Sequence, residues 1–408
     1  MYCKFLILTC LAGALAVKDY SGYKVLRVSP PDESSLQYLR GLESQYDFWS
    51  DSRGVGHSAD IMVSGDGYGL LTSTLKKMGF SIETMIGDMQ PLIDDQMKAS
   101  AIGFDYYDYH TMPEIEQWMK DFTAENPGLV QMEEFATTYY GRRVSKIKIS
   151  SDFSDTTKPI FFMIGGTHAR EWICPAALMN IANMLVQSNG SPGSLLDLME
   201  FHIVPVFNQD GYDYTWTDDR MWRKTRSPNA DSICAGTDPN RNFDCQWNTG
   251  GSSSRECSQT YMGTAPASEI EIAGMQEHVF GIRDRVKVFM DVHAYSQYWM
   301  YPYGYSETVP ADDVELRAAS KASADAVFAT HGKNFEYGPI ANVIYIASGS
   351  SADWGYDVAG IKHSYALELR DTGEYGFLLP ASQILPTTEE FYAGCEALVH
   401  YLRDNGGL

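Results

Sequence analysis

The N-terminal part of the chain alternates short strand patterns with helical patterns. Residues 23–29 place apolar and polar side chains in turn, as a strand with one buried face does, and the Pro-Pro-Asp sequence at 30–32 opens a helical stretch. Further strand-like runs at 59–63 and 81–86 flank a helical segment around 70–78. The pattern predicts a small α+β unit of roughly eighty residues.

Downstream, the apolar runs become continuous, which is typical of strands that are buried on both faces. Strands are expected from these runs at 159–164, 201–207, 286–292 and 364–369, and helical patterns separate them at 112–125, 175–187, 313–330 and 388–402. This alternation predicts an α/β domain of about three hundred residues, in which helices cover a mixed central sheet. The polar segment 94–103, whose one basic residue is Lys98, is the expected linker between the two units.

An apolar segment at 5–16 follows Lys4 and ends in small residues. Roughly a dozen apolar residues are too few to cross a bilayer, so we interpret residues 1–16 as a cleaved secretory signal. A membrane anchor or a buried core helix is the alternative. The expected organisation is a signal peptide at 1–16, an N-terminal unit at 17–98 and a larger domain at 99–408, in a secreted protein.

Composition and charge narrow the classes of function. With 408 residues, 44% of them hydrophobic, the chain can bury a large core, which excludes a wholly disordered protein. Lys and Arg number 31 against 53 Asp and Glu, which gives a formal charge of −22. Such an acidic chain repels other polyanions, so we expect no nucleic-acid partner and no attachment to an acidic membrane.

The cysteines allow a disulfide, because disulfides persist outside the cell. Of the 7 cysteines, two fall in the signal segment, and an odd number remains for pairing. A bridge between Cys234 and Cys257 would close a short loop rich in Gly, Ser and Asn and stabilise the fold by about 3 kcal/mol. The alternative is a set of five buried thiols: Cys174, Cys234, Cys245, Cys257 and Cys395.

Candidate metal ligands occur at the ends of two expected strands. His168 and Glu171 follow the strand at 159–164, and a helical turn would place both on one side, where they could share a zinc ion. The pattern His-x-x-Glu is common, and a salt-bridged helix start would also explain it. His293 ends the strand at 286–292 and is the candidate third ligand, with a buried core histidine as the alternative. Three protein ligands leave one position for water, which is the layout of a catalytic zinc site.

Glu368 is the candidate base for such a site. It lies at the end of another apolar strand, where a buried carboxylate is costly unless it has a partner. Zinc lowers the pKa of a bound water to about 7, so a carboxylate can accept its proton at neutral pH. A buried ion pair with Arg370 is the alternative.

Several motifs, taken together, closely resemble the pancreatic-type zinc metallocarboxypeptidases. In chain order they are HAREW at 168–172, WRKTRS at 222–227, DPNRN at 238–242, HAYSQ at 293–297, YPYG at 301–304 and ELRDTG at 368–373. The resemblance implies a digestive zymogen whose N-terminal unit is an activation segment, and the linker fits its release by a trypsin-like protease that cuts after Lys98. It also implies hydrolysis at the C-termini of peptides or proteins, and we expect a monomer.

The resemblance further assigns the metal site and the base. His168, Glu171 and His293 would bind one zinc ion per chain, and Asp238 would orient a ligand histidine. Glu368 would activate the zinc-bound water as general base and then donate its proton to the leaving amine.

The same resemblance implies the substrate-binding residues. Arg226 would polarise the scissile carbonyl, with Arg223 beside it. Asn240 and Arg241 would grip the C-terminal carboxylate of the substrate, because a planar guanidinium meets a carboxylate through two hydrogen bonds. Further implied features are the subsite residues Arg170 and Tyr295, the mobile Tyr345 that closes over the substrate, and a disulfide between Cys234 and Cys257.

The pocket for the last substrate side chain decides specificity. Relatives that remove Lys or Arg carry an aspartate at the position of Ala352, and the other aligned positions Gly304, Ile340 and Ala366 are neutral too. Because a cation would lack a counter-ion there, we expect release of aromatic or large aliphatic residues by a carboxypeptidase of the A type. The alternatives are a non-catalytic relative that binds C-terminal peptides, and a zinc amidase or endopeptidase.

Overall fold

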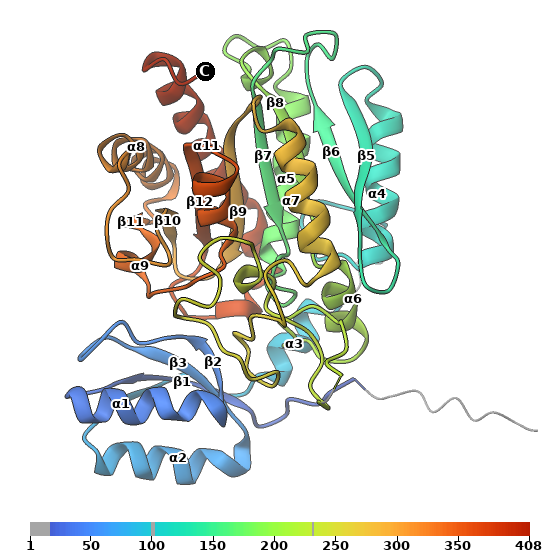
Figure 1. Ribbon diagram of the computed structural model, residues 1–408. Coiled ribbons are helices and arrows are strands. Elements are labelled where there is room, and N and C mark those ends of the chain that lie inside the picture. Colours follow the sequence, from blue (N-terminus) through green and yellow to red (C-terminus); the bar gives the residue numbers. More distant parts are fainter. Residues whose placement is uncertain (1–16, 99–102, 231) are drawn as a thin grey trace, which may run out of the picture.

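The computed structural model describes residues 17–98, 103–230 and 232–408, which form a small and a large domain (Figure 1). The expected signal peptide at 1–16 lies outside the described residues, and so does the residue that follows Lys98 in the expected cleavage bond. Both expectations therefore stay predictions. Within the described ranges, no helix combines the length and the apolar character that crossing a bilayer requires.

The small domain packs two helices against one face of a four-stranded antiparallel sheet. Its strands are β1 Lys24–Ser29, β2 Asp47–Ser50, β3 Ala59–Val63 and β4 Ser81–Ile86, in the order β2-β3-β1-β4. The helices α1 Glu33–Gly41 and α2 Gly65–Lys77 lie along the face of this sheet that points away from the large domain (Figure 1). Leu26 and Val28 of β1 pack with Leu39 of α1 and with Leu71 and Leu75 of α2. This one-sided burial is what the alternating pattern at 23–29 predicts.

The large domain is built on an eight-stranded mixed sheet, which confirms the predicted fold class. The strand order is β11-β10-β12-β9-β7-β8-β6-β5. The central strands β12, β9, β7 and β8 run parallel, whereas β10 is antiparallel to β12 and β6 is antiparallel to β8. The strands are β5 Val130–Thr137, β6 Arg143–Ile149, β7 Ile160–Gly165, β8 Glu200–Val204, β9 Val286–Ala294, β10 Tyr298–Tyr301, β11 Glu336–Pro339 and β12 His363–Leu369.

Helices cover both faces of the large sheet. Phe161 and Met163 of β7 face the cluster that includes α5, α8 and α11, whereas Ile160, Phe162 and Ile164 face the cluster that includes α7. Burial on both sides explains why this strand is apolar throughout. Two further helical elements belong to the residues before Lys98, η1 Leu42–Ser44 and α3 Gln90–Gln96. The helices of the large domain are α4 Met112–Glu125, α5 Ile173–Gln187, α6 Gln209–Thr217, α7 Ile270–Ile282, α8 Asp313–His331, α9 Ile340–Val343, α10 Ser351–Asp353 and α11 Ile384–Asp404, and its shorter helical turns are η2 Leu195–Asp197, η3 Pro239–Arg241, η4 Trp354–Val358, η5 Gly376–Leu378 and η6 Ala381–Gln383.

Some elements differ from the sequence-based expectations. The hairpin β5–β6 and the short strands β2, β10 and β11 are additional to the predicted strands. β2, β10 and β11 have 4 residues each, too few to show a clear period. The expected linker at 94–103 begins inside α3, which continues to Gln96.

The disulfide between Cys234 and Cys257 is present, which confirms that prediction. It closes a loop with a sequence separation of 23 residues. A loop of this length contributes about 3 kcal/mol to stability by restricting the unfolded chain. Among the residues that the structure describes, Cys174, Cys245 and Cys395 are free and buried, and no second disulfide joins them.

Candidate functional site

The candidate site lies at the carboxyl ends of the parallel strands β7, β9 and β12. His168 follows β7, and Glu171 lies in the turn that leads into α5. His293 lies near the end of β9, and the strand register places Glu368 of β12 beside it. Since the carboxyl ends of parallel strands meet at one edge of a sheet, side chains far apart in sequence converge there.

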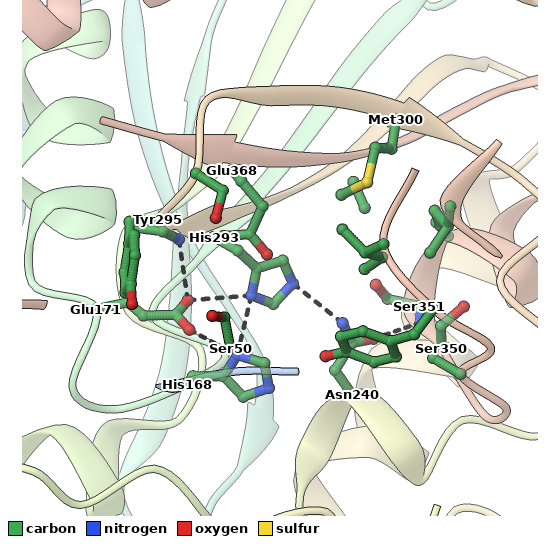
Figure 2. Close-up of a pocket in the computed structure, with 18 of the residues that line it drawn as sticks. Ser50, His168, Glu171, Asn240, His293, Tyr295, Met300, Ser350, Ser351 and Glu368 are labelled. Atoms are coloured by element: carbon green, nitrogen blue, oxygen red, sulfur yellow. Dashed lines mark hydrogen bonds and ion pairs between the residues drawn. The ribbon is translucent and has the colours of Figure 1, made fainter. Parts of the chain in front are cut away.

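His168, Glu171 and His293 form one compact, buried cluster (Figure 2). Their potential ligand atoms all lie within 4.8 Å of one another. Nδ1 of His168 is 2.8 Å from Oε1 of Glu171, and Nδ1 of His293 is 3.1 Å from Oε2 of the same carboxylate. Two imidazole nitrogens and a carboxylate are a donor set that zinc prefers in catalytic sites. The structure thus brings together the three predicted ligands.

The surroundings of the cluster fit a bound cation. Nε2 of His168 lies 3.0 Å from Asp238, and Nε2 of His293 lies 3.0 Å from Asp291. Each carboxylate can accept a proton on Nε2, which leaves both Nδ1 lone pairs directed at the common point. Burial opposes charge on His293, but Asp291 and Glu171 outweigh it and raise the pKa of this imidazole well above its ordinary range. The cluster therefore attracts positive charge, as a zinc site must.

One carboxylate oxygen of Glu368 has no hydrogen-bond partner in the part of the chain that the structure describes. Oε2 is buried and unpaired, although the side chain reaches the cleft. Burial raises the pKa of the Glu368 carboxyl well above its ordinary range, and the nearby charge of Glu171 raises this pKa further. Arg370 does not pair with it, because the guanidinium of Arg370 binds Glu390 through Nε at 2.8 Å. The geometry thus leaves Glu368 free to exchange a proton.

Asn240 and Arg241 lie on η3, beside the metal cluster. Asn240 lines the cleft, its Oδ1 accepts a hydrogen bond from the backbone N–H of Ser351 at 2.9 Å, and its Nδ2 lies 3.1 Å from Nε2 of His293. The guanidinium of Arg241 donates to the carbonyl oxygen of Gly251 at 2.9 Å, and its Nη2 is 3.4 Å from Oη of Tyr345. Gly349, at φ 71°, packs so tightly that a Cβ would lie 2.3 Å from the carbonyl oxygen of Arg241.

The two arginines of the WRKTRS motif occupy different places. Arg223 lines the cleft and binds Oδ2 of Asp238 through Nη2 at 2.9 Å. Among the described residues that line the cleft, Arg226 is absent. Its guanidinium stacks on Tyr214 and Trp222, with Cζ 3.6 Å and 4.2 Å from the two ring centroids. The structure therefore does not place Arg226 at the cleft, where the predicted carbonyl-polarising role would require it; of the two arginines, Arg223 lines the cleft.

The pocket beyond the metal cluster has apolar walls. Ile340, Ala352 and Ala366 pack with Met300, and all of them line the cleft. Ala352 is 0% exposed. Gly304 is the one predicted pocket position that does not line the cleft among the described residues. The apolar cluster carries no charge to match a basic substrate side chain.

Asp353, the buried carboxylate nearest in sequence to Ala352, is not among the described residues that line the cleft. Asp353 accepts hydrogen bonds from the backbone N–H groups of Gly304 and Tyr305. Burial raises the pKa of Asp353 to about 7 despite these bonds. Its carboxylate is therefore engaged by the backbone N–H groups of Gly304 and Tyr305.

Strand β2 of the small domain covers the mouth of this cleft. Asp47 binds Arg170 through Nη1 at 2.7 Å, and Asp60 of β3 accepts a hydrogen bond from Oη of Tyr295 at 2.7 Å. The ring of Trp49 packs on Phe377 at a centroid distance of 4.9 Å. Arg170 and Tyr295, two of the predicted substrate-binding residues, are thus bound by side chains of the N-terminal domain.

Several residues of the site are additional to the sequence-based predictions. Asp291 is the chemically important one, and its place two residues before His293 in an apolar strand is a signal that could have revealed it. The others that line the cleft include Ser50, Met300, Ile344, Ala347, Ser351 and Phe377.

Comparisons with known proteins agree with this geometry. A family model described as zinc carboxypeptidase matches residues 115–394, and one described as carboxypeptidase activation peptide matches residues 26–96. Carboxypeptidase A1 of Homo sapiens is 40% identical over 403 residues, covering 94% of this chain and 95% of the relative. Carboxypeptidase B of Canis lupus familiaris is 38% identical, covering 98% of each chain. A crystal structure of thrombin activatable fibrinolysis inhibitor superposes with a TM-score of 0.88 at 31% identity, covering 94% of this chain and 99% of that one.

Proposed function

The chain belongs to the zinc carboxypeptidase family and carries its activation peptide, and from this we propose that it is a secreted zymogen of an A-type carboxypeptidase. The activated enzyme hydrolyses the last peptide bond of its substrate and prefers aromatic or large aliphatic C-terminal residues. The observation that carries this preference is Ala352, a small and uncharged side chain in the apolar wall of the pocket.

The family uses one zinc ion, and the residues that would hold it are His168, Glu171 and His293. When bound, zinc supplies Lewis-acid chemistry, lowering the pKa of a water molecule and polarising a substrate carbonyl. Asp238 holds the ring of His168 so that its Nδ1 faces the site.

Asn240 and Arg241 bind the free carboxylate at the end of the substrate. The amide Nδ2 and the guanidinium both donate hydrogen bonds, and the charge of Arg241 matches that of the carboxylate. Tyr345 lies against this guanidinium and contributes a hydroxyl on the same side. Because only a chain end offers a free carboxylate at this place, the clamp favours cleavage of the terminal bond over internal bonds.

Glu368 and Arg223 serve the reacting carbonyl group. The unpaired Oε2 of Glu368 accepts a proton from the attacking water and then delivers it to the nitrogen of the leaving amino acid. Arg223, held by Asp238, directs positive charge toward the carbonyl oxygen, where negative charge develops in the transition state.

Activation requires removal of the domain at 17–98, because its strand β2 covers the cleft. We propose cleavage after Lys98 by a protease that recognises basic residues, which would release the domain at 99–408. The side chain of Lys98 is 72% exposed and its one ion-pair partner in the described chain is Asp95, at 2.7 Å. An exposed lysine just beyond the end of α3 is accessible to such a protease.

A substrate panel tests the proposed function. Full-length protein is treated with trypsin and offered peptides that end in Phe, Leu, Lys or Glu, together with a C-terminally amidated Phe peptide. We expect release of Phe and Leu, little release of Lys or Glu, and no turnover of the amide. Preference for Lys would contradict the pocket argument, and turnover of the amide would favour an amidase or endopeptidase.

The non-catalytic alternative is tested with the same panel. A protein that only binds C-terminal peptides would bind the Phe peptide and release nothing from it. Zinc removal by a chelator should abolish turnover, and its return should restore it. Turnover that survives complete chelation would refute the metal-dependent chemistry.

A further inference from the structure

Asp291 is a buried carboxylate beside the metal cluster that neither the sequence motifs nor the resemblance singles out. It is 0% exposed and precedes His293 by two residues on β9, so both side chains lie on the same face of the strand. Its Oδ2 lies 3.0 Å from Nε2 of His293. Hydroxyl groups donate to the same carboxylate, from Ser351 to Oδ2 at 2.5 Å and from Thr167 to Oδ1 at 2.8 Å.

These contacts connect segments that carry the metal ligands and the clamp. Thr167 directly precedes His168, so its hydrogen bond fixes the strand end that presents this ligand. Ser351 begins α10, and its backbone N–H donates to Oδ1 of Asn240 at 2.9 Å. The carboxylate of Asp291 thus links the segments that carry His168 and His293 to α10, whose first residue contacts Asn240.

Metal binding requires one tautomer of His293. Its Nδ1 faces the metal cluster, 3.1 Å from Oε2 of Glu171, and must be unprotonated to bind a metal ion. Nε2 then carries the proton and needs an acceptor. The amide Nδ2 of Asn240 is 3.1 Å from Nε2 but is itself a donor, because Oδ1 of Asn240 is engaged by Ser351. Oδ2 of Asp291, in ion-pair contact with Nε2 at 3.0 Å, is the acceptor within reach.

A buried charge of this kind needs a compensating interaction. The ion-pair partner of Asp291 in the described chain is His293, and the hydroxyl groups of Thr167 and Ser351 complete its hydrogen bonds. An apolar side chain would pack in β9 without the cost of desolvating a charge. The contact with His293 therefore accounts for a carboxylate at this position.

We propose that Asp291 is a positioning residue that fixes the tautomer and ring orientation of His293 and thereby strengthens zinc binding. Asp238 has the corresponding contact with His168, so each ligand histidine is oriented by its own carboxylate. The inference rests on the proposed zinc site and adds a residue to it that supports the metal without touching the substrate.

Zinc affinity of the full-length chain tests this role without using peptidase activity. Parent protein and variants are stripped of metal, and zinc is returned in competition with a chromophoric chelator. We expect Asp291→Ala to weaken zinc binding by about 10- to 100-fold. We expect a loss of about tenfold for Asp291→Asn, whose amide oxygen can still accept from Nε2 but carries no charge.

A matched control separates this effect from general damage. Asp353→Asn alters another fully buried carboxylate of the same region, which binds backbone N–H groups and none of the ligands. It should leave zinc affinity unchanged. Visible spectra of the cobalt-substituted proteins should change for the Asp291 variants only, because the orientation of His293 sets the ligand field.

The outcomes distinguish this inference from the proposed function. A parent chain that binds no zinc overturns both. Tight zinc binding by the parent and equally tight binding by Asp291→Asn or Asp291→Ala overturns only the role of Asp291, and so does an equal loss in Asp353→Asn. If Asp291→Ala does not fold, the nearly isosteric Asp291→Asn decides the question, with thermal unfolding of the metal-free proteins as the check on folding.

Discussion

A negative charge at the position of Ala352 should redirect the enzyme toward basic C-terminal residues. Ala352 is fully buried and packs with Met300, Ile340 and Ala366, so the introduced carboxylate of Ala352→Asp would stand in an apolar wall without a partner. A substrate Lys side chain would bring an ammonium group to it. At a separation of about 4 Å and an effective dielectric constant of about 20, their attraction is about 4 kcal/mol.

Part of this attraction is offset when the ammonium group loses its water, while a Phe side chain would now meet a charge it cannot satisfy. A net change of about 3 to 4 kcal/mol in relative transition-state binding corresponds to a shift of about 100- to 1000-fold in the ratio of kcat/KM for Lys over Phe. Without substrate, Ala352→Asp buries an unpaired carboxylate, so we expect its free energy of unfolding to be lower than that of the parent.

Trypsin-activated parent, Ala352→Asp and Ala352→Asn are compared with peptides that differ only in their last residue, Phe or Lys. The kcat/KM ratio within each variant is independent of the fraction of folded protein. Ala352→Asn has the size of the aspartate without its charge and should not gain activity toward Lys. The electrostatic reasoning fails if Ala352→Asn gains as much as Ala352→Asp, or if neither variant changes the ratio.

Glu368→Gln should lower kcat by about 10²- to 10⁴-fold while leaving zinc content unchanged, measured by steady-state kinetics and metal analysis; near-parental kcat would exclude Glu368 as the base. Asp47→Ala leaves the buried guanidinium of Arg170 without its ion-pair partner, which should destabilise the contact between the two domains by about 3 kcal/mol or more. We therefore expect trypsin to activate this variant in a shorter time than the parent. An unchanged activation time would show that the contact between Asp47 and Arg170 does not hold the N-terminal domain over the cleft. Burial raises the pKa of Glu271 to about 7, so the folded state holds a proton that the unfolded state releases, and stability should fall as pH rises from about 4.5 to 7. Glu271→Gln should keep the contact with the backbone N–H of Tyr139. It should also reduce the loss of stability between pH 5 and pH 8 by up to about 3 kcal/mol, measured by urea unfolding at these two pH values. An unchanged pH dependence would show that Glu271 is ionised in the folded protein.

The types of the candidate site residues can be predicted from the sequence, but the residues that contact them in the folded protein cannot. His168, Glu171, His293 and Glu368 all follow or end apolar runs, and strand ends are where side chains converge in a parallel sheet. The same local reasoning missed Asp291, whose importance depends on hydroxyl groups from two other segments. Its burial and partners exist only after β7, β9 and α10 have packed together.

The two arginines of the WRKTRS motif also show that a sequence pattern does not fix where a side chain points. Arg223 and Arg226 are three residues apart in one motif, and no periodic pattern distinguishes them. The turn between them sends one guanidinium to Asp238 in the cleft and the other to the rings of Tyr214 and Trp222. A resemblance that treats the motif as one unit could not decide which arginine faces the substrate.

The resemblance supplied Ala352 as a pocket position, whereas local patterns were sufficient for the α+β and α/β architecture and for the types of the candidate metal ligands. These features depend on the periodicity and chemistry of neighbouring residues, which folding does not alter. The pairing of Asp47 with Arg170, the choice between Arg223 and Arg226, and the contact of Asp291 with His293 became known only from the folded chain. Such contacts require separate segments to meet within a few ångströms, and that meeting is set by the packing of the whole core.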